Sequence, residues 1–228
     1  MSNLNLNNWL KINQICALCD LYPVEQEGVC KKCLTDLPFF HTGCPVCALP
    51  GGNGMCHACQ RQRATFEWTT AGFTYRFPMP QLIHRIKSGK DPEPLFWLAH
   101  LLAQCTAKQL PKTAVLVPVP MHPFDQLLRG FNQSELLARR LANCAELKLD
   151  TQLVRKFKRS SKQAKLNRKQ RTENLSDCFE MMASPPAEVV LVDDVMTTAT
   201  TVRRLSELLL SAGCQRVGVC VLCRTPAD

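Results

Sequence analysis

Residues 189–202 read VVLVDDVMTTATTV, and their pattern decides the fold class. Four apolar residues precede two adjacent aspartates, an apolar pair and a run of small hydroxylated residues. The valine-rich run predicts a buried strand of a parallel sheet, and the residues after it predict a turn into a helix. In open α/β sheets, ligands bind at the carboxyl ends of the strands, where a helix N-terminus offers unpaired N–H groups to an anion. We therefore expect an α/β fold with its ligand site directly after this strand.

The side chains of this stretch suit a sugar phosphate. Asp193 and Asp194 can accept hydrogen bonds from sugar hydroxyls. Amides and hydroxyls can surround a phosphate at the next segment, here named the threonine turn: Thr197, Thr198, Ala199, Thr200 and Thr201. A simpler interpretation is a strand that ends in two solvated aspartates before an ordinary threonine-capped helix. The whole pattern favours the phosphate site.

Positive charge is concentrated in one segment. The chain has 228 residues, enough for one well-buried domain and a smaller one, and a formal net charge of +9. Nine basic residues and no acidic residue lie within residues 155–171: Arg155, Lys156, Lys158, Arg159, Lys162, Lys165, Arg168, Lys169 and Arg171. Such a segment favours binding to the phosphates of a nucleotide or of a nucleic acid. A solvated surface loop is the alternative.

Eight of the fourteen cysteines form four Cys-x-x-Cys pairs. The pairs are Cys16 and Cys19, Cys30 and Cys33, Cys44 and Cys47, and Cys56 and Cys59. Two such pairs complete a tetrahedral thiolate site, so the pattern predicts two structural zinc ions. Sequential pairing closes shorter loops than interleaved pairing and is favoured for that reason. Four thiolates leave no position for water, which argues against metal catalysis; thiol redox chemistry or zinc storage is the alternative.

Neither a secretory leader nor a membrane span is visible. The first 14 residues, MSNLNLNNWLKINQ, lack a basic start followed by an apolar core and a cleavage site. No apolar run approaches the roughly 18 residues of a membrane span. We therefore expect a cytoplasmic protein with no membrane insertion, and with reduced, metal-bound cysteines.

Short patterned runs predict the other elements of the larger domain. Strands are expected at residues 69–77, 114–119, 153–157, 179–182 and 217–222, and helices at 82–87, at 95–110, directly after Asn132, and from Val202 to a stop at Gly213. Residues 121–131 are expected to form a loop, in which Arg129 is either a phosphate contact or a surface arginine. Asn132 is expected to cap the next helix, with Glu135 completing a capping box. The buried stripe of that helix is expected at Leu136, Leu137, Leu141 and Cys144.

These features together resemble the ComF/GntX family. The shared features, in the family's order, are the four cysteine pairs, VPVP at 117–120, His122-Pro123, RGFNQ at 129–133, Gln163, Leu166, Arg168, Arg171, Asn174-Leu175 and the Asp193-Asp194 motif. RGFNQ is the most specific of them. Residues 189–201 also resemble the motif with which type I phosphoribosyltransferases bind 5-phosphoribosyl-1-pyrophosphate (PRPP). Two departures leave turnover open: Ala199 replaces the family's glycine, and Phe124-Asp125 replaces a common basic pair.

The resemblance implies a type I phosphoribosyltransferase-like parallel sheet with flanking helices over residues 63–228, preceded by a double zinc ribbon over residues 1–62. It implies catalytic roles for Asp193, Asp194 and Arg129, and binding of PRPP or phosphate, with Mg²⁺, by the threonine turn together with Met121 and His122. A mobile basic loop would fold over the substrate: Lys162, Lys165, Arg168, Lys169 and Arg171.

The implied role is in natural competence and in the uptake and use of external DNA, with competence proteins and single-stranded DNA as expected partners besides PRPP or a nucleotide. The alternative is a zinc-ribbon protein without catalysis that binds single-stranded DNA or DNA-processing partners and keeps a degenerate phosphoribosyl-binding domain.

Overall fold

The structure is a computed structural model that describes residues 15–24, 28–52, 54–89, 91–158 and 178–227. The chain divides into two compact units, Met1–Leu37 and Pro38–Asp228. The first cysteine quartet therefore lies in the first unit, and the second quartet lies in the same unit as the sheet. The domain boundary expected near residue 62 stays a prediction.

The first unit is built around a short helix and a cysteine cluster. Helix α1 (Lys31–Thr35) begins after Cys30, whose sulfur accepts a hydrogen bond from the amide of Cys33. An isolated antiparallel bridge joins Ile15 to Pro23. Such a small unit cannot bury a large apolar core, so a bound metal would be expected to stabilise it.

A five-stranded parallel sheet forms the centre of the second unit. Its strands are β1 (Trp68–Thr74), β2 (Val115–Pro118), β3 (Lys148–Leu149), β6 (Glu188–Met196) and β7 (Arg216–Arg224), in the order β1-β7-β6-β2-β3. Parallel sheets of this kind are covered on both faces. Val189 and Val190, whose side chains point to opposite faces of β6, are accordingly both fully buried.

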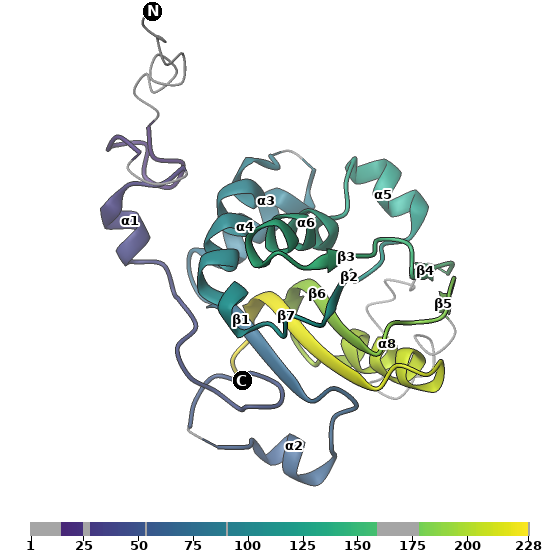
Figure 1. The fold of residues 1–228 in the computed structure, drawn as a ribbon. Coiled ribbons are helices and arrows are strands. Elements are labelled where there is room, and N and C mark those ends of the chain that lie inside the picture. Colours follow the sequence, from purple (N-terminus) through teal and green to yellow (C-terminus); the bar gives the residue numbers. More distant parts are fainter. Residues whose placement is uncertain (1–14, 25–27, 53, 90, 159–177, 228) are drawn as a thin grey trace, which may run out of the picture. The chain divides into compact units, whose positions relative to one another are not determined.

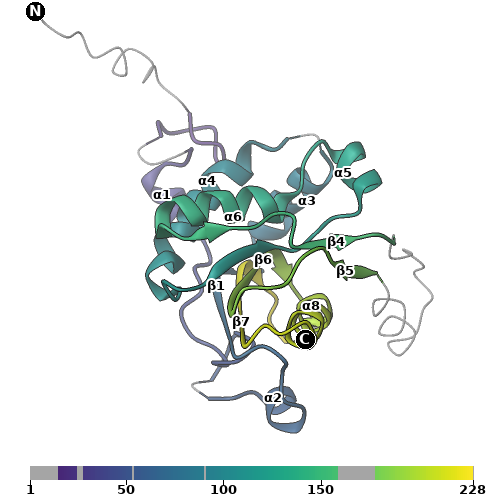
Figure 2. The same ribbon diagram turned by 45° about the vertical axis from the view of Figure 1, so that its right-hand side comes forward.

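Helices cover the sheet on both faces. Helices α4 (Glu93–Thr106) and α6 (Gln133–Ala145) pack on one face, and α8 (Thr200–Ser211) packs on the other (Figures 1 and 2). Helix α3 (Met79–Lys87) packs against α4, and a 3₁₀ turn (Ala107–Gln109) follows α4. None of the helices in the described ranges is long and apolar enough to span a membrane.

Strand β6 runs further than the apolar pattern indicated. It pairs with β7 as far as Met196, which lies opposite Arg224. Asp193 and Asp194 therefore lie within the strand, near the end of the β6–β7 pairing, and not after it. Their side chains still lie at the carboxyl end of the sheet, because β2 pairs with β6 only as far as Val192.

The prediction that residues 121–131 form a loop is wrong. Residues Pro123–Arg129 form helix α5, which begins with proline at its first position and ends at Gly130, where φ is +85°. The His122 ring Nδ1 caps this helix by accepting a hydrogen bond from the amide of Phe124 at 3.1 Å. These are ordinary helix start and stop signals, and the short length of the segment concealed them.

The strands expected near residues 155 and 180 exist, but outside the main sheet. Strands β4 (Val154–Lys156) and β5 (Phe179–Met181) pair with each other antiparallel. Most of the basic segment connects them in sequence, and residues 159–177 of this connection lie outside the described ranges.

The N-terminal end of α6 is capped as predicted, but its buried stripe differs. The Asn132 side chain accepts a hydrogen bond from the amide of Ser134 at 3.1 Å. Glu135 pairs with Arg139 one turn later, in place of the expected capping box. Leu136 is only half-buried and Cys144 is exposed. The stripe that packs on the sheet and on α4 consists of Leu137, Ala138, Leu141, Ala142 and Ala145.

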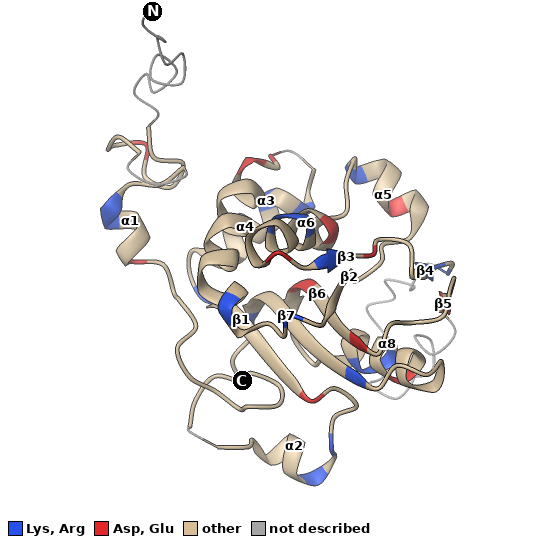
Figure 3. Cartoon of the chain, in the orientation of Figure 1, with Lys and Arg blue, Asp and Glu red and all other residues tan. Residues whose placement is uncertain are grey.

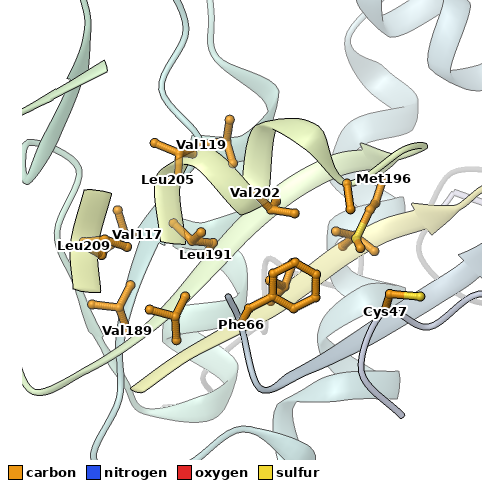
Figure 4. Close-up of a cluster of buried hydrophobic side chains, with 14 of the residues drawn as sticks. Cys47, Phe66, Val117, Val119, Val189, Leu191, Met196, Val202, Leu205 and Leu209 are labelled. Atoms are coloured by element: carbon orange, nitrogen blue, oxygen red, sulfur yellow. The ribbon is translucent and has the colours of Figure 1, made fainter. Parts of the chain in front are cut away.

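The second cysteine quartet belongs to the core on the α8 face of the sheet. Cys44, Cys47 and Cys59 are buried together with side chains of β6, β7 and α8 (Figure 4). Phe39 and Phe73 form an antiparallel bridge, and the Thr69 hydroxyl donates to the carbonyl of Val46 at 2.7 Å. The segment that carries the quartet is thereby attached to β1.

Candidate functional site

A cavity of about 500 Å³ opens at the carboxyl ends of β2 and β6. Four of the residues predicted from the sequence line it: Met121, Arg129, Asp193 and Asp194. Lys156, from the predicted basic segment, also lines it, together with polar residues that the sequence did not assign to the site: His84, Lys87, Ser88, Asn132, Gln133 and Ser134. The cavity therefore has carboxylates, cations and neutral polar groups in its wall, as a phosphorylated sugar requires.

Hydrogen bonds hold the two carboxylates in place. Asp193 Oδ1 accepts from the Ser134 hydroxyl at 3.0 Å and from the amide of Asp194 at 2.9 Å. Asp194 Oδ1 accepts from the amide of Val195 at 2.7 Å. Ser134 stands in the first turn of α6, directly after the RGFNQ motif, so α6 helps to orient a β6 carboxylate.

The carboxylates differ in their electrostatic surroundings. Asp194 is buried, with 8% of its surface exposed, and it forms an ion pair with Lys87, whose Nζ lies 2.9 Å from Oδ2. Burial of Asp193 and the neighbouring Asp194 carboxylate raise the pKa of Asp193 to about 7. The pair thus carries less than two full negative charges near neutral pH in the absence of ligand.

Lys87 is the main site residue that the sequence did not reveal. It is the last residue of α3, far from β6 in the chain, and a lysine at a helix C-terminus is common for electrostatic reasons alone. Only the packing of α3 brings its ammonium group to Asp194. Lys156, at the end of β4, was predicted only as part of a phosphate-binding basic segment. Figure 3 shows basic residues on α5 and beside β4, the elements that carry Arg129 and Lys156.

The threonine turn lies beside the cavity. All five of its residues line a smaller hollow of about 40 Å³, and Asp193 lines both spaces. The Thr198 and Thr200 hydroxyls lie 2.8 Å apart. Ala199 precedes α8 and offers no side-chain cap to it, so amides of the first turn of α8 remain available to an anion.

Ala199 adopts the backbone conformation that usually requires glycine. Its φ is +61° and its ψ is +12°, in the left-handed region. An alanine there costs about 1 kcal/mol or more relative to glycine. Its methyl group is nevertheless buried among the α8-face side chains, with 7% of the residue exposed. The turn therefore accommodates alanine in a left-handed conformation.

Besides the threonine turn, two further groups of predicted residues are not among the described residues that line the larger cavity. The His122 ring is engaged in capping α5 and is not part of the cavity wall described above, so its phosphate role stays a prediction. The basic loop of Lys162, Lys165, Arg168, Lys169 and Arg171 lies outside the described residues.

A second cavity of about 490 Å³ adjoins the first. Pro120, Met121, Asn132 and Lys156 line both spaces, and β4 supplies Val154 and Arg155 to the second one. A ligand in the first cavity would therefore have neighbouring space for a reaction partner.

The cysteines form two quartets, as sequential pairing predicted. Within each quartet the four Sγ atoms lie within 4.8 Å of one another. The Cys19–Cys30 and Cys47–Cys56 sulfur distances are 3.9 Å and 3.6 Å. A tetrahedral zinc site with Zn–S bonds of about 2.3 Å has S–S edges of about 3.8 Å. Both quartets therefore fit a four-thiolate metal ion.

Comparisons with known proteins identify relatives of this chain. Residues 129–228 match the model of the phosphoribosyl transferase domain. The DNA utilization protein YhgH of Salmonella typhi is 31% identical over 225 residues, which cover 95% of this chain and 99% of that protein. Competence protein F of Haemophilus influenzae is 28% identical, over 88% of this chain and 92% of that protein. Among solved structures, a hypoxanthine phosphoribosyltransferase from Staphylococcus aureus is 14% identical, with a TM-score of 0.40 over 59% of this chain and 67% of that one. The domain match and the parallel sheet confirm the expected phosphoribosyltransferase-like fold.

Proposed function

The chain belongs to the ComF/GntX family of competence and DNA-utilisation proteins, and from that premise we propose that its larger cavity binds PRPP or a related phosphoribosyl ligand. One observation carries the proposal: the carboxylates of Asp193 and Asp194 share the cavity wall with the cations Lys87, Arg129 and Lys156. PRPP has the matching arrangement, with ribose hydroxyls between two phosphorylated ends.

The ribose 5-phosphate half would lie over β6 and the start of α8. Asp193 and Asp194 would accept hydrogen bonds from the ribose hydroxyls, because ionised carboxylates are acceptors only. The 5-phosphate would occupy the hollow of the threonine turn, where hydroxyls and the first-turn amides of α8 can donate to it. Asp193 lines both spaces and would mark the junction between sugar and phosphate.

The pyrophosphate half would lie near Met121 and Arg129. Arginine binds phosphate oxygens with two parallel N–H donors, and Arg129 at the end of α5 supplies such a group to the cavity. Mg²⁺ carried by PRPP would neutralise part of the pyrophosphate charge. Lys156 would contribute a further positive charge from the side of β4.

The reaction that such a site can support is phosphoribosyl transfer. The bond between ribose C1 and the pyrophosphate oxygen breaks, pyrophosphate leaves with both bonding electrons, and an acceptor forms a new bond to C1. The protein would contribute positioning and charge stabilisation and no side-chain nucleophile. The adjoining second cavity offers the acceptor a place to enter.

We further propose that both cysteine quartets hold structural zinc and that the protein acts in the cytoplasm. Four thiolates fill a tetrahedral zinc site, so the metal ions would stabilise structure and leave no position for a substrate.

Isothermal titration calorimetry with PRPP, with and without Mg²⁺, tests the binding proposal. We expect Mg²⁺-dependent binding by the wild-type chain, and its loss in the double variant Asp193→Asn, Asp194→Asn. Equal binding by the two proteins would end the proposal.

Titrations with ribose 5-phosphate and with pyrophosphate test the two halves of the site separately. Arg129→Met should weaken pyrophosphate and PRPP binding by about tenfold or more, as expected for a lost charge-assisted contact, and should leave ribose 5-phosphate binding unchanged. Arg139→Met is the matched control, because Arg139 is exposed on α6 and lines neither cavity. Weakening by both variants alike would indicate a general charge effect and not a phosphate contact.

A second function, binding of single-stranded DNA, is favoured by the basic segment. Its described part, Arg155, Lys156 and Lys158, begins at the wall of the second cavity. The phosphate backbone gives such binding a steep salt dependence. This function would fit the family's role in the use of external DNA, with or without phosphoribosyl transfer.

Fluorescence anisotropy with a labelled oligonucleotide tests this second function. We expect affinity that falls steeply with salt and is reduced when Lys162, Lys165, Arg168 and Lys169 are replaced by glutamine. No binding at low salt, or unchanged binding by the neutralised variant, would exclude it.

A further inference from the structure

Arg224 is a buried arginine that joins the second cysteine quartet to the start of the threonine turn. Only 5% of its surface is exposed. Its Nε donates to the carbonyl of Cys47 at 2.7 Å, and its Nη2 lies 4.0 Å from the Cys47 sulfur. Its Nη1 donates to the carbonyls of Met196 at 3.0 Å and Thr197 at 2.8 Å. One guanidinium group therefore contacts both a metal-ligand candidate and the segment that enters the phosphate site.

The position of Arg224 is determined by the sheet. Arg224 ends β7 opposite Met196, the last residue of β6, and the amide of Thr225 donates to the Met196 carbonyl at 3.1 Å. The ladder between the strands stops there. The Arg224 side chain continues the attachment beyond the ladder by binding the Thr197 carbonyl, the first one in the threonine turn.

The charge of Arg224 is compensated only in part by its hydrogen bonds. Its described acceptors are the carbonyls of Cys47, Met196, Thr197 and Thr225 and the sulfur of Cys47, with no carboxylate among them. A buried cation is costly without a negative partner. Four thiolates and one Zn²⁺ carry a formal charge of roughly −2, so a metal-loaded second quartet would supply that partner. Protonated, metal-free thiols would supply none.

The threonine turn needs such support because it is strained. Ala199 stands two residues after Thr197 with φ at +61°. A non-glycine residue persists in that conformation only where the surroundings enforce it. Cys44, Cys47 and Cys59 pack in the same buried cluster as Met196, Ala199 and Val202; Figure 4 labels Cys47, Met196 and Val202 in this cluster.

We propose that Arg224 is a positioning residue for the phosphate site and that, through it, the metal state of the second cysteine quartet sets the conformation of the threonine turn. We assign no such role to the first quartet, which lies in the other compact unit. The conformational part of this inference stands on the contacts of Arg224; its consequence for phosphate binding rests on the function proposed above.

Hydrogen exchange at the amides of residues 197–203, read by mass spectrometry together with zinc content, tests the inference without any ligand. Arg224→Lys keeps the positive charge but cannot reach all of its acceptors. We expect it to retain two zinc ions per chain and to exchange at these amides about tenfold faster than the wild type, as for a lost restraint on local opening. Two zinc ions with wild-type exchange at these amides would overturn the proposal.

The two quartets provide a matched comparison. Cys56→Ser, in the second quartet, and Cys19→Ser, in the first, replace half-buried cysteines. We expect each to lose one zinc ion, and only Cys56→Ser to accelerate exchange in the turn. Equal acceleration by both variants would overturn the assignment to the second quartet.

A chelator titration of the Cys19→Ser variant removes the second metal ion without a further substitution, which covers the case in which Cys56→Ser does not fold. Amides of the threonine turn should lose protection as that zinc ion leaves, before the β6 and β7 amides do. Simultaneous loss would contradict a specific link between this metal ion and the turn.

Failure of PRPP binding would leave these exchange results intact, so the failures of the two proposals can be told apart. If PRPP does bind, Arg224→Lys should weaken the binding of PRPP and of ribose 5-phosphate, and it should leave the binding of pyrophosphate unchanged.

Discussion

Lys87 Nζ lies 2.9 Å from Asp194 Oδ2, so a cation from the end of α3 neutralises a buried carboxylate of β6. The lysine keeps 40% of its side-chain surface exposed, whereas the Asp194 side chain keeps 11%. In the absence of ligand, this contact compensates the carboxylate and attaches the end of α3 to the carboxyl end of β6. Binding of a sugar at Asp194 would have to share or replace it.

Lys87→Met should lower the free energy of unfolding, because it leaves Asp194 buried without its cation. We expect a loss of about 1–2 kcal/mol, less than for a fully buried pair because Lys87 is partly solvated. Urea denaturation measures the effect. Arg85→Met is the control, since the Arg85–Asp91 pair in the same region is exposed and should matter little. If Lys87→Met costs as much in an Asp194→Asn background, the two residues are not coupled.

The stability of the protein should fall with rising pH through the titration of Asp193. The pKa of Asp193 is raised to about 7 by burial and by Asp194, from an ordinary value of 3.8. Between these values the folded state holds a proton that the unfolded state has lost, so stability decreases as pH rises and levels off above about 7. Urea denaturation from pH 4 to 8 should show this decrease for the wild type relative to Asp193→Asn. Parallel curves for the two proteins would refute the raised pKa.

Substitutions of Ala199 should distinguish strain from packing. Ala199→Gly relieves a cost of about 1–2 kcal/mol from the positive φ but loses a buried methyl group worth about 0.8 kcal/mol and makes the unfolded chain more flexible. We expect a net stability change within about 1 kcal/mol. Ala199→Val, a branched residue at positive φ, should destabilise by about 2 kcal/mol or more. Ala183→Val, at an exposed position, is the control for urea denaturation. An Ala199→Val variant with wild-type stability would contradict the left-handed conformation of residue 199.

Gly218 permits the close packing of β1 on β7. Gly218 is paired with Trp68, and a Cβ added at this glycine would lie 2.2 Å from the indole ring. We expect Gly218→Ala to destabilise the protein by about 1–3 kcal/mol, because the ring must move out of its place. Thermal or urea denaturation measures the loss. Gly54→Ala should be nearly neutral, since nothing lies within 4 Å of its added Cβ; similar losses for both would count against a specific clash at Trp68.

Several parts of the candidate site were predictable because they depend on short stretches of chain. The Asp-Asp pair, the threonine turn and the capping by Asn132 all lie within a few residues of a strand end or a helix start. The sequential cysteine quartets follow from short loops between pairs. Helix α5 has equally local signals, His122-Pro123 before it and Gly130 after it, but its 7 residues are too few for a clear apolar period.

The parallel α/β fold and the two cysteine quartets could be predicted from the sequence, as could the candidate sugar-phosphate residues, because strand pattern, Cys-x-x-Cys spacing and turn chemistry act over short distances along the chain. Only the tertiary structure decided that Lys87 neutralises Asp194, 107 residues away, and that Arg224 reaches Cys47, 177 residues away. Those contacts depend on how α3 packs and on where the β6–β7 ladder ends. Residue type and local spacing predict neither the Lys87–Asp194 nor the Arg224–Cys47 contact, because each forms only when the sheet and its helices assemble.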